Sequence, residues 1–499
     1  MTDIGQRSGA LLAAPPSTES TSQATPRSAV LWGVALVALG ASFAAWMWGF
    51  TIDDAFISIR YARHLASGAG YRFNIDGPST DGVTPLPWPF VLAPLAHASA
   101  LEVLFRAKCI NLISWLVAAF FLGKRIGAAD ARPVWRIAAM LVLALDLPVI
   151  AGAVSGMETG VATALVTLAA LEADRNRVYC ACIVGGFSAA FRPELAPWAI
   201  AVSIGLTLSS RDAKRIVLAC ALAAGPFVVC ALTRLFVFGH LAPLAVLAKP
   251  SDLSHGAQYV LAAALASLTF VLALAPLSIA RSSATTRALA VAALVHLVAV
   301  ALAGGDWMPY ARLLAPVAPS LALVFVRSAP FANRYASLTR VIVASLLGLR
   351  LVLFAAPLGR HVQRDRESLI AASRAYLQNA RIVASADIGW PSAATEAHIV
   401  DLAGLTDPNI AALGGGHTSK RVDPAMVIDS NADVVLLYAT ADVGAATLSG
   451  WHSAEYEKLV DVRLASSALF SRHFDAVAFL PLGDRGAGYV VLTRISPPP

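Results

Sequence analysis

Long apolar runs separated by short polar loops fill residues 29–357 of this chain. Each run is near the roughly 20 residues that an α-helix needs to cross a bilayer. The pattern therefore predicts a polytopic α-helical membrane protein with about eleven transmembrane helices. The predicted spans are 29–50, 108–123, 134–154, 157–171, 178–191, 194–210, 216–237, 258–280, 287–303, 311–327 and 337–357.

A further apolar run, 85–105, is interrupted by prolines and a histidine. Lys and Arg residues in short loops favour the cytoplasmic side of a membrane. All the basic loops share that side if the N-terminus is cytoplasmic and 85–105 does not cross. We therefore expect 85–105 to be a re-entrant or juxtamembrane segment and the C-terminus to be extracytoplasmic. The basic loops contain Lys124, Arg125, Arg132 and Arg136, then Arg175 and Arg177, then Arg211, Lys214 and Arg215, then Arg281 and Arg287, then Arg327, Arg334 and Arg340.

The two ends of the chain differ in composition from the apolar region. Residues 1–28 are rich in Ser, Thr, Pro, Ala and Gln, which predicts a disordered cytoplasmic tail. The transmembrane domain then covers 29–357, with a large external loop at 51–107. Residues 358–499 are more charged and predict a small extracytoplasmic α/β domain. Its predicted elements are a helix at 367–378 and strands at 381–386, 398–402, 432–438 and 489–495.

Composition agrees with a membrane protein and argues against other classes. Hydrophobic residues make up 57% of the chain and charged residues only 14%, whereas globular proteins carry about a quarter charged residues. The net charge of +7 is explained by the basic loops, and their scattered Lys and Arg residues argue against a nucleic-acid partner. No glycine-rich phosphate-binding signature is present, which argues against an ATP-driven pump.

The most informative motif is Asp53-Asp54, directly after the first apolar run. Carboxylates at a membrane face are costly, which suggests a function for them. One could accept a proton as a general base, while the other caps the following helix or binds a hard divalent cation such as Mg²⁺ or Ca²⁺. That helix, expected at 55–67, is amphipathic and would lie at the membrane surface, with Arg60 and Arg63 near lipid headgroups.

The predicted topology places most of the other unusual polar residues on the same external face as Asp53 and Asp54. An enzyme that acts at the outer leaflet would have this distribution, whereas a transporter would place more charges near the midplane of the bilayer. These residues are Asp76, Asp81, Glu158, Arg192, Glu194, His240, Lys249, Asp306 and Trp307.

Several of these motifs together resemble the GT-C class of membrane glycosyltransferases, and in particular arabinofuranosyltransferases of the AftB type. The resemblance covers about residues 51–440 and is carried by seven motifs in order. They are Asp53-Asp54-Ala55-Phe56-Ile57-Ser58-Ile59-Arg60-Tyr61, Gly68-Ala69-Gly70-Tyr71 with Asp81-Gly82-Val83-Thr84-Pro85, Gly156-Met157-Glu158-Thr159, Arg192-Pro193-Glu194, Gly239 to Lys249, Gly304-Gly305-Asp306-Trp307-Met308 and Asp401-Leu402-Ala403-Gly404-Leu405-Thr406-Asp407-Pro408.

The resemblance implies a polyprenyl-phosphate sugar as donor, possibly of arabinofuranose, and a cell-envelope polysaccharide or glycolipid as acceptor. It also implies a location in the bacterial cytoplasmic membrane with the active site on the outer face. The chain has Asp81-Gly82-Val83 where the family often has a Glu-Gly pair before Thr84, and Ala245-Val246-Leu247-Ala248 where an Asn-Thr pair often precedes Lys249. The resemblance therefore does not fix the sugar.

For such a reaction, Asp53 and Asp54 are the candidate catalytic residues, and no cofactor is required. Candidates for the donor phosphate are Arg192, Lys249, Arg312 and His240. Arg192 could instead pair with Glu158 or Glu194, and Lys249 could extend to the membrane surface. Candidates for the acceptor or sugar are Asp306, Trp307, Glu158 and Asp81.

Structural alternatives exist for the acceptor candidates as well. Glu158 opens a span, where the helix dipole favours a carboxylate. Asp306 could cap the next span, and Asp81 could be a solvated loop acid or part of a loop that closes over substrate. Two other functions also fit parts of the sequence: a lipid-linked-sugar flippase without catalysis, and an assembly scaffold that acts through the C-terminal domain.

Overall fold

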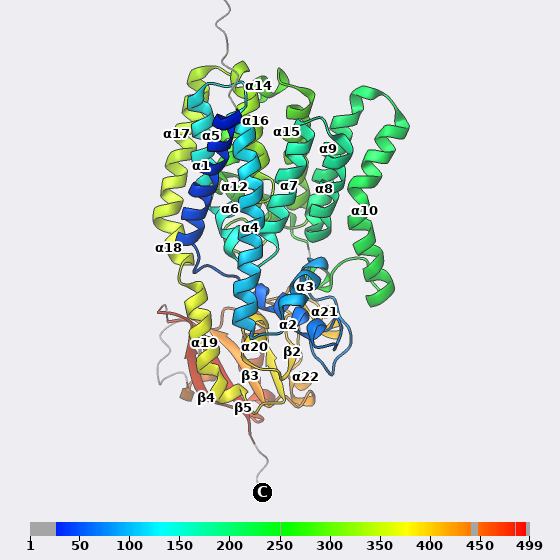
Figure 1. Cartoon of the computed structure of the whole chain (residues 1–499). Coiled ribbons are helices and arrows are strands. Elements are labelled where there is room, and N and C mark those ends of the chain that lie inside the picture. The colour runs from blue at the N-terminus through cyan, green and yellow to red at the C-terminus, as the bar shows by residue number, and fades with distance from the viewer. Residues whose placement is uncertain (1–25, 250, 441–447, 485, 496–499) are drawn as a thin grey trace, which may run out of the picture.

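The computed structural model describes residues 26–249, 251–440, 448–484 and 486–495. A bundle of helices forms one part of the molecule, and a five-stranded sheet with short helices forms the other (Figure 1). Helix α2 (Asp54–Ala66) and helix α3 (Pro87–Leu92) lie between them. Most of the predicted N-terminal tail, residues 1–25, lies outside the described residues, and α1 begins at Pro26.

The bundle is built from helices of very different length. They are α1 (Pro26–Trp46), α4 (Ala100–Gly127), α5 (Pro133–Ala144), α6 (Leu147–Val154), α7 (Thr159–Asp174), α8 (Val178–Phe191), α9 (Ala196–Thr207), α10 (Ala213–Phe238), α11 (Leu244–Leu247), α12 (Leu253–Ala266), α13 (Leu268–Ala273), α14 (Pro276–Ala280), α15 (Ala284–Leu302), α16 (Ala318–Ser328), α17 (Arg334–Arg350) and α18 (Ala356–Gly359).

The expectation of eleven spans is wrong. Within the described residues, five helices are long and apolar enough to cross a membrane, and a sixth is added if α5 and α6, bent by 48°, form one span. The five are Arg27–Trp46, Ala100–Gly127, Ala213–Phe238, Ala284–Leu302 and Arg334–Leu377. The apolar helices fit a membrane protein, but their number is smaller than the number of apolar runs.

The difference arises because many apolar runs form helices that are too short. An α-helix rises 1.5 Å per residue, so α9, with 12 residues, covers only about 18 Å of a core about 30 Å thick. The predicted span 258–280 is divided into α12, α13 and α14, with breaks at Ser267 and Leu274–Ala275. Segment 85–105 is likewise divided between α3, a 3₁₀ turn and the start of α4, and contains no membrane-length helix.

Two sets of charged residues mark opposite ends of the bundle. Asp174 forms ion pairs with Arg125 and with Arg327 (2.7 Å), which joins the ends of α4, α7 and α16. These ends lie away from the sheet (Figure 1). The loop that begins at Thr51 lies at the other end, against the sheet domain. Arg125 and Arg327 are therefore separated along the bundle from the Asp53-Asp54 motif.

The C-terminal part forms a mixed sheet in the order β2-β1-β3-β5-β4. β1 pairs with β2 and β3 in parallel, and β5 pairs with β3 and β4 antiparallel. Its elements are α19 (Val362–Leu377), β1 (Ile382–Ser385), α20 (Gly389–Ala394), β2 (His398–Asp401), α21 (Pro408–Ala411), α22 (Pro424–Asp429), β3 (Val434–Ala439), α24 (Leu459–Ala465), α25 (Ala468–Ser471), β4 (Phe474–Pro481) and β5 (Gly488–Arg494).

The four predicted strands and the predicted helix of this part are confirmed, and β4 is a strand that the sequence reasoning missed. The central strand β3 is apolar along its length, with only Tyr438 partly exposed. β4 is an edge strand in which exposed and buried residues mix, and a bulge at Ala476–Ala478 interrupts its register. Both features weaken the period-two signal by which strands are recognised.

Helix α2 joins the bundle to the sheet domain through α20. Asp53 Oδ2 and Oδ1 accept hydrogen bonds from the backbone N–H groups of Gly389 and Trp390, both at 3.1 Å, at the start of α20. Arg60 donates to the carbonyls of Thr395 (3.1 Å) and Ala397 (2.7 Å), just after the end of α20. A carboxylate therefore lies at the N-terminus of α20 and a guanidinium cation at its C-terminus, as the helix dipole favours. We call these contacts the α2–α20 clamp.

The clamp corrects the expectation that α2 lies on the membrane surface. Arg60 is 1% exposed, and its Nε also donates to the carbonyl of Phe73 at 2.7 Å. Its guanidinium therefore binds the protein's own backbone and not lipid headgroups. The helix itself forms as predicted, but protein covers it on both faces.

We expect Arg60→Ala to destabilise the protein by about 2 kcal/mol, because it leaves one buried and two partly buried carbonyls without this donor. Arg63 is the matched control on the same helix, since its ion pair with Glu396 is partly exposed. Arg63→Ala should cost less than about 1 kcal/mol. Thermal unfolding of both variants in detergent micelles measures the difference. Equal unfolding temperatures would show that the clamp does not hold the two parts together.

Candidate functional site

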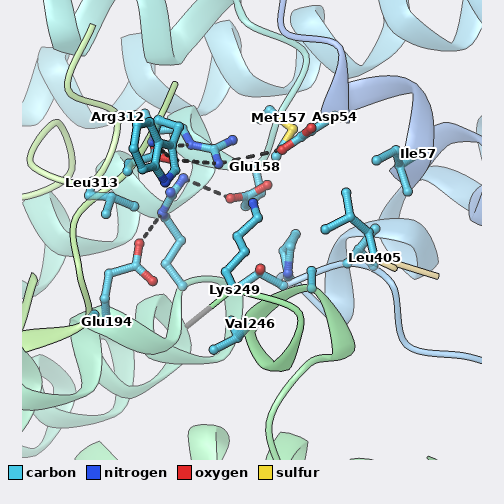
Figure 2. A pocket seen from close by; sticks show the side chains of 18 of the residues that line it. Asp54, Ile57, Met157, Glu158, Glu194, Val246, Lys249, Arg312, Leu313 and Leu405 are labelled. Atoms are coloured by element: carbon cyan, nitrogen blue, oxygen red, sulfur yellow. Dashed lines mark hydrogen bonds and ion pairs between the residues drawn. The ribbon is translucent and has the colours of Figure 1, made fainter. Parts of the chain in front are cut away.

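Two adjoining cavities lie between the bundle and the sheet domain. The bundle cavity has a volume of about 200 Å³ and is lined mainly by residues of the bundle and its loops, among them Glu158, Arg192 and Arg312 (Figure 2). The sheet cavity has a volume of about 310 Å³ and includes Arg366, Asp387 and Lys458. The residues that line both are Asp54, Ile57, Lys249, Asp306, Trp307 and Leu405.

Asp54 is the first residue of α2, and its carboxylate lies on the wall that the two cavities share. Its side chain is 23% exposed, and Oδ2 is 3.7 Å from Arg312 Nη2. Figure 2 shows it facing the groups of the bundle cavity. A carboxylate that is held at one side and open at the other is suited to accept a proton from a bound hydroxyl.

Asp53, its neighbour, has a different environment. Both of its oxygens accept hydrogen bonds from backbone N–H groups at the start of α20, and Arg366 Nε lies 3.5 Å from Oδ1. Burial raises the pKa of Asp53 to about 6, with Arg366 opposing and Asp387 adding to the rise. Asp53 occupies the N-cap position of α2 but makes no side-chain cap bond there. The predicted cap is therefore made to α20, which is distant in sequence.

Arg312 and Asp306 form a second pair at the shared wall. Arg312 Nε donates to Asp306 Oδ2 at 2.6 Å, and Nη2 lies 3.3 Å from Oδ1. Burial by itself raises the pKa of Asp306, but Arg312 together with Lys249 and Arg192 holds it below its ordinary value. Asp306 is therefore ionised at neutral pH and orients the guanidinium of Arg312, whose Nη1 has no hydrogen-bond partner among the described residues.

Arg192 is held in the bundle cavity by two carboxylates. Its Nη1 donates to Glu158 Oε1 (2.9 Å) and to Thr159 Oγ1 (2.8 Å), and its Nε donates to Glu194 Oε1 (2.7 Å). Burial raises the pKa of Glu158, with Arg192 and Arg312 opposing. The ion pairs that the sequence offered as an alternative for Arg192 are thus both present, and they lie in the wall of the cavity.

Lys249 differs from the other cations that line the cavities. Arg192, Arg312, Arg366 and Lys458 each pair with a carboxylate, whereas no ion pair involves Lys249 in the described part of the chain. Its side chain extends into the bundle cavity from the segment after α11 (Figure 2). A cation without a carboxylate partner is the one most available to a bound anion.

Two residues predicted for the site lie outside both cavities. Asp81 is 0% exposed and forms a buried ion pair with Arg234 of α10, while its carbonyl accepts the N–H of Leu244 at 2.9 Å. It therefore supports the segment that leads to Lys249. His240 uses Nδ1 to bond the carbonyl of Ala242 at 2.6 Å and is not among the lining residues.

Four polar residues of the sheet cavity were missed, all from the sheet domain: Arg366, Asp387, His417 and Lys458. Asp387 follows β1, and a carboxylate beyond the carboxyl end of a parallel strand was a usable signal. It pairs with Lys458, and Tyr489 donates to it at 2.7 Å. Burial opposes ionisation of Asp387, but Lys458 holds its pKa below the ordinary value. Lys458 and His417 lie in loops without a sequence signal.

The comparisons with known proteins concern mainly this C-terminal part. The model of a family described as "Domain of unknown function (DUF8728)" matches residues 360–486. This range begins just before α19 and ends before β5, and it contains Arg366, Asp387 and Lys458. No curated protein matches the chain.

The two adjacent acids should respond differently to substitution. Asp53→Asn replaces one of the two oxygens that accept the backbone N–H groups of Gly389 and Trp390 with an NH2 group, and should destabilise the protein by about 2 kcal/mol. Asp54→Asn, the matched control one residue away, keeps the shape of a partly exposed side chain and should change stability by less than about 0.5 kcal/mol. Thermal unfolding in micelles measures both, and the reverse order would refute the structural role of Asp53.

His417 should make stability depend on pH. Burial lowers its pKa to about 4, with Lys249 and Lys458 adding to the effect, whereas the unfolded value is near 6.5. Between these values the unfolded chain binds more protons, so stability falls as pH decreases from about 6.5 towards 4. His417→Gln should make the unfolding temperature depend less on pH between 7 and 5. An unchanged profile would show that His417 does not contribute.

Proposed function

We propose that this protein is a membrane glycosyltransferase of the GT-C class that uses a polyprenyl-phosphate sugar as donor. The acceptor is a cell-envelope glycan, the site faces the outside of a bacterial cytoplasmic membrane, and arabinofuranose is the sugar that the sequence resemblance favours. The observation that carries the proposal is the position of Asp54, on the wall shared by two cavities that come from different parts of the molecule.

The proposed reaction joins the contents of the two cavities. The oxygen of an acceptor hydroxyl attacks the anomeric carbon of the donor sugar, and its proton passes to Asp54. The bond between the anomeric carbon and the phosphate oxygen breaks, and the polyprenyl phosphate leaves with the electron pair. A base on the shared wall can reach a hydroxyl that enters from one side and a sugar that enters from the other.

The bundle cavity has groups that suit the donor phosphate. Lys249 and Arg312 supply positive charge where charge develops on the leaving group. Four carboxylates line this cavity with three cations: Asp54, Glu158, Glu194 and Asp306, with Arg192, Lys249 and Arg312. A proton on Glu158, whose pKa burial raises, would make their numbers equal.

A divalent cation is not needed in this proposal, although Asp54 remains the oxygen ligand that could hold one. Both oxygens of Asp53, the other ligand suggested by the sequence, already accept backbone N–H groups. The residues that the structure describes contain no cluster of three or more His, Cys, Asp and Glu side chains arranged to hold a metal. In this proposal Lys249 and Arg312 carry the phosphate charge.

A flippase remains the second candidate, and one observation favours it. Asp146 is buried at the break between α5 and α6 and faces the break between α12 and α13. Broken helices with a buried acid between them are features of transporters. However, Asp146 Oδ2 accepts hydrogen bonds from the Ser267 hydroxyl (3.0 Å) and from the backbone N–H of Thr269 (3.3 Å). It acts as a cap for α13 and lies outside both cavities.

We expect Asp54→Asn to lower transfer by at least about 100-fold, the lower end of the contribution of a general base. Membranes with each variant are supplied with radiolabelled polyprenyl-phosphate arabinofuranose, and glycan-bound label is counted. Lys249→Met should also lower transfer, whereas Arg63→Met, a cation outside the site, should not. Label that crosses the bilayer without forming glycosidic bonds would support the flippase and refute the transferase.

A further inference from the structure

The sheet cavity has its own set of polar groups in addition to Lys249, which it shares with the bundle cavity. Its other cations, Arg366 and Lys458, are each paired with a carboxylate, Asp53 and Asp387. The side chains of Asp387 and Lys458 are 29% and 14% exposed, so both retain surface for a ligand. Each ion pair has no net charge and offers donors and acceptors next to one another. This suits hydroxyl groups better than phosphates or carboxylates.

An exposed aromatic ring lies at the shared wall beside these groups. Trp307 is 66% exposed. His255 stacks on its ring with centroids 4.0 Å apart and 12° between planes, which fixes the orientation of the indole. An aromatic ring that is held in place and left open beside polar groups can be covered by the apolar face of a ligand. The C–H face of a sugar ring has the shape and polarity to do so.

His417 completes the set from the sheet-domain side. Its ring centroid is 6.2 Å from that of Trp307, at 57°. Because burial and nearby Lys249 and Lys458 keep this imidazole neutral at pH 7, it offers one donor and one acceptor without charge. Few polar groups around an aromatic surface are the usual composition of a small-ligand site.

We infer that the sheet cavity binds a neutral polyhydroxylated glycan, with Trp307 as the stacking surface and Asp387, Lys458 and His417 as hydrogen-bonding groups. This inference rests on the proposed function, because it makes this glycan the acceptor whose hydroxyl reaches Asp54. It also assigns a role to the region 360–486: recognition of the acceptor, separate from binding of the lipid-linked donor in the bundle cavity.

Binding of fluorescein-labelled oligosaccharides to the full-length protein in detergent micelles tests the inference without any turnover. The neutral probes are linear oligomers of arabinose, mannose, galactose and glucose, and oligogalacturonate is the anionic probe. We expect saturable binding of at least one neutral probe and none of oligogalacturonate. Trp307→Ala and Asp387→Asn should each weaken binding by at least about tenfold, a difference of about 1.4 kcal/mol.

Two matched controls separate binding from general damage. Asp484→Asn removes an exposed acid of the same domain, and Tyr335→Ala removes an exposed aromatic ring of α17 at the other end of the bundle. Neither should change binding. Trp307→Ala alters an exposed side chain, so it keeps the test valid if Asp387→Asn fails to fold.

The outcomes distinguish this inference from the proposed function. If transfer occurs but glycan binding is the same in Trp307→Ala and Asp387→Asn as in the parent protein, this inference is refuted and the proposed function stands. If no neutral probe binds, or only oligogalacturonate does, it is refuted as well. If glycan binding depends on Trp307 and Asp387 but no transfer occurs, the glycan site stands and the transferase proposal fails.

Discussion

The position of Asp54 depends on the way in which α2 is attached to the sheet domain. One turn of α2 carries Asp53 and Asp54, whose carboxylates have opposite roles: the first binds the amides at the start of α20, and the second faces the cavities. Arg60 fixes the other end through carbonyls beyond α20. Because both ends of the clamp are polar and partly buried, breaking either leaves poorly satisfied groups, which makes the attachment specific.

The cations around the cavities differ in whether a carboxylate pairs with them. Arg192 and Arg312 are oriented by carboxylates, so their charge is largely compensated before any ligand binds. Lys249 is not compensated in this way, and it comes from a segment that the buried Asp81–Arg234 pair supports. Residues far from a ligand thus determine where positive charge is available to it.

The sequence predicted some levels of this structure well and others poorly. Apolar runs and β-propensity located the helices and four of the five strands, because those signals are local. The number of spans was overestimated because an apolar run does not show where a helix breaks, as at Ser267. Asp54, Lys249 and Asp306 could be selected as unusual polar residues at apolar boundaries, and they meet at one wall. The partners of Asp53 and Asp81 could not, because Gly389 and Arg234 are distant in sequence and their pairing depends on the tertiary fold.

The last apolar helix is connected to the site through helical backbone. The 44 residues Arg334–Leu377 are divided into α17, a π-helical stretch at Leu351–Ala355, α18 and α19. α17 belongs to the apolar bundle, and α19 carries Arg366 into the sheet domain, where its guanidinium pairs with Asp53. A shift of α17 within the bundle is therefore passed through short helices and one turn to the residue next to Asp54.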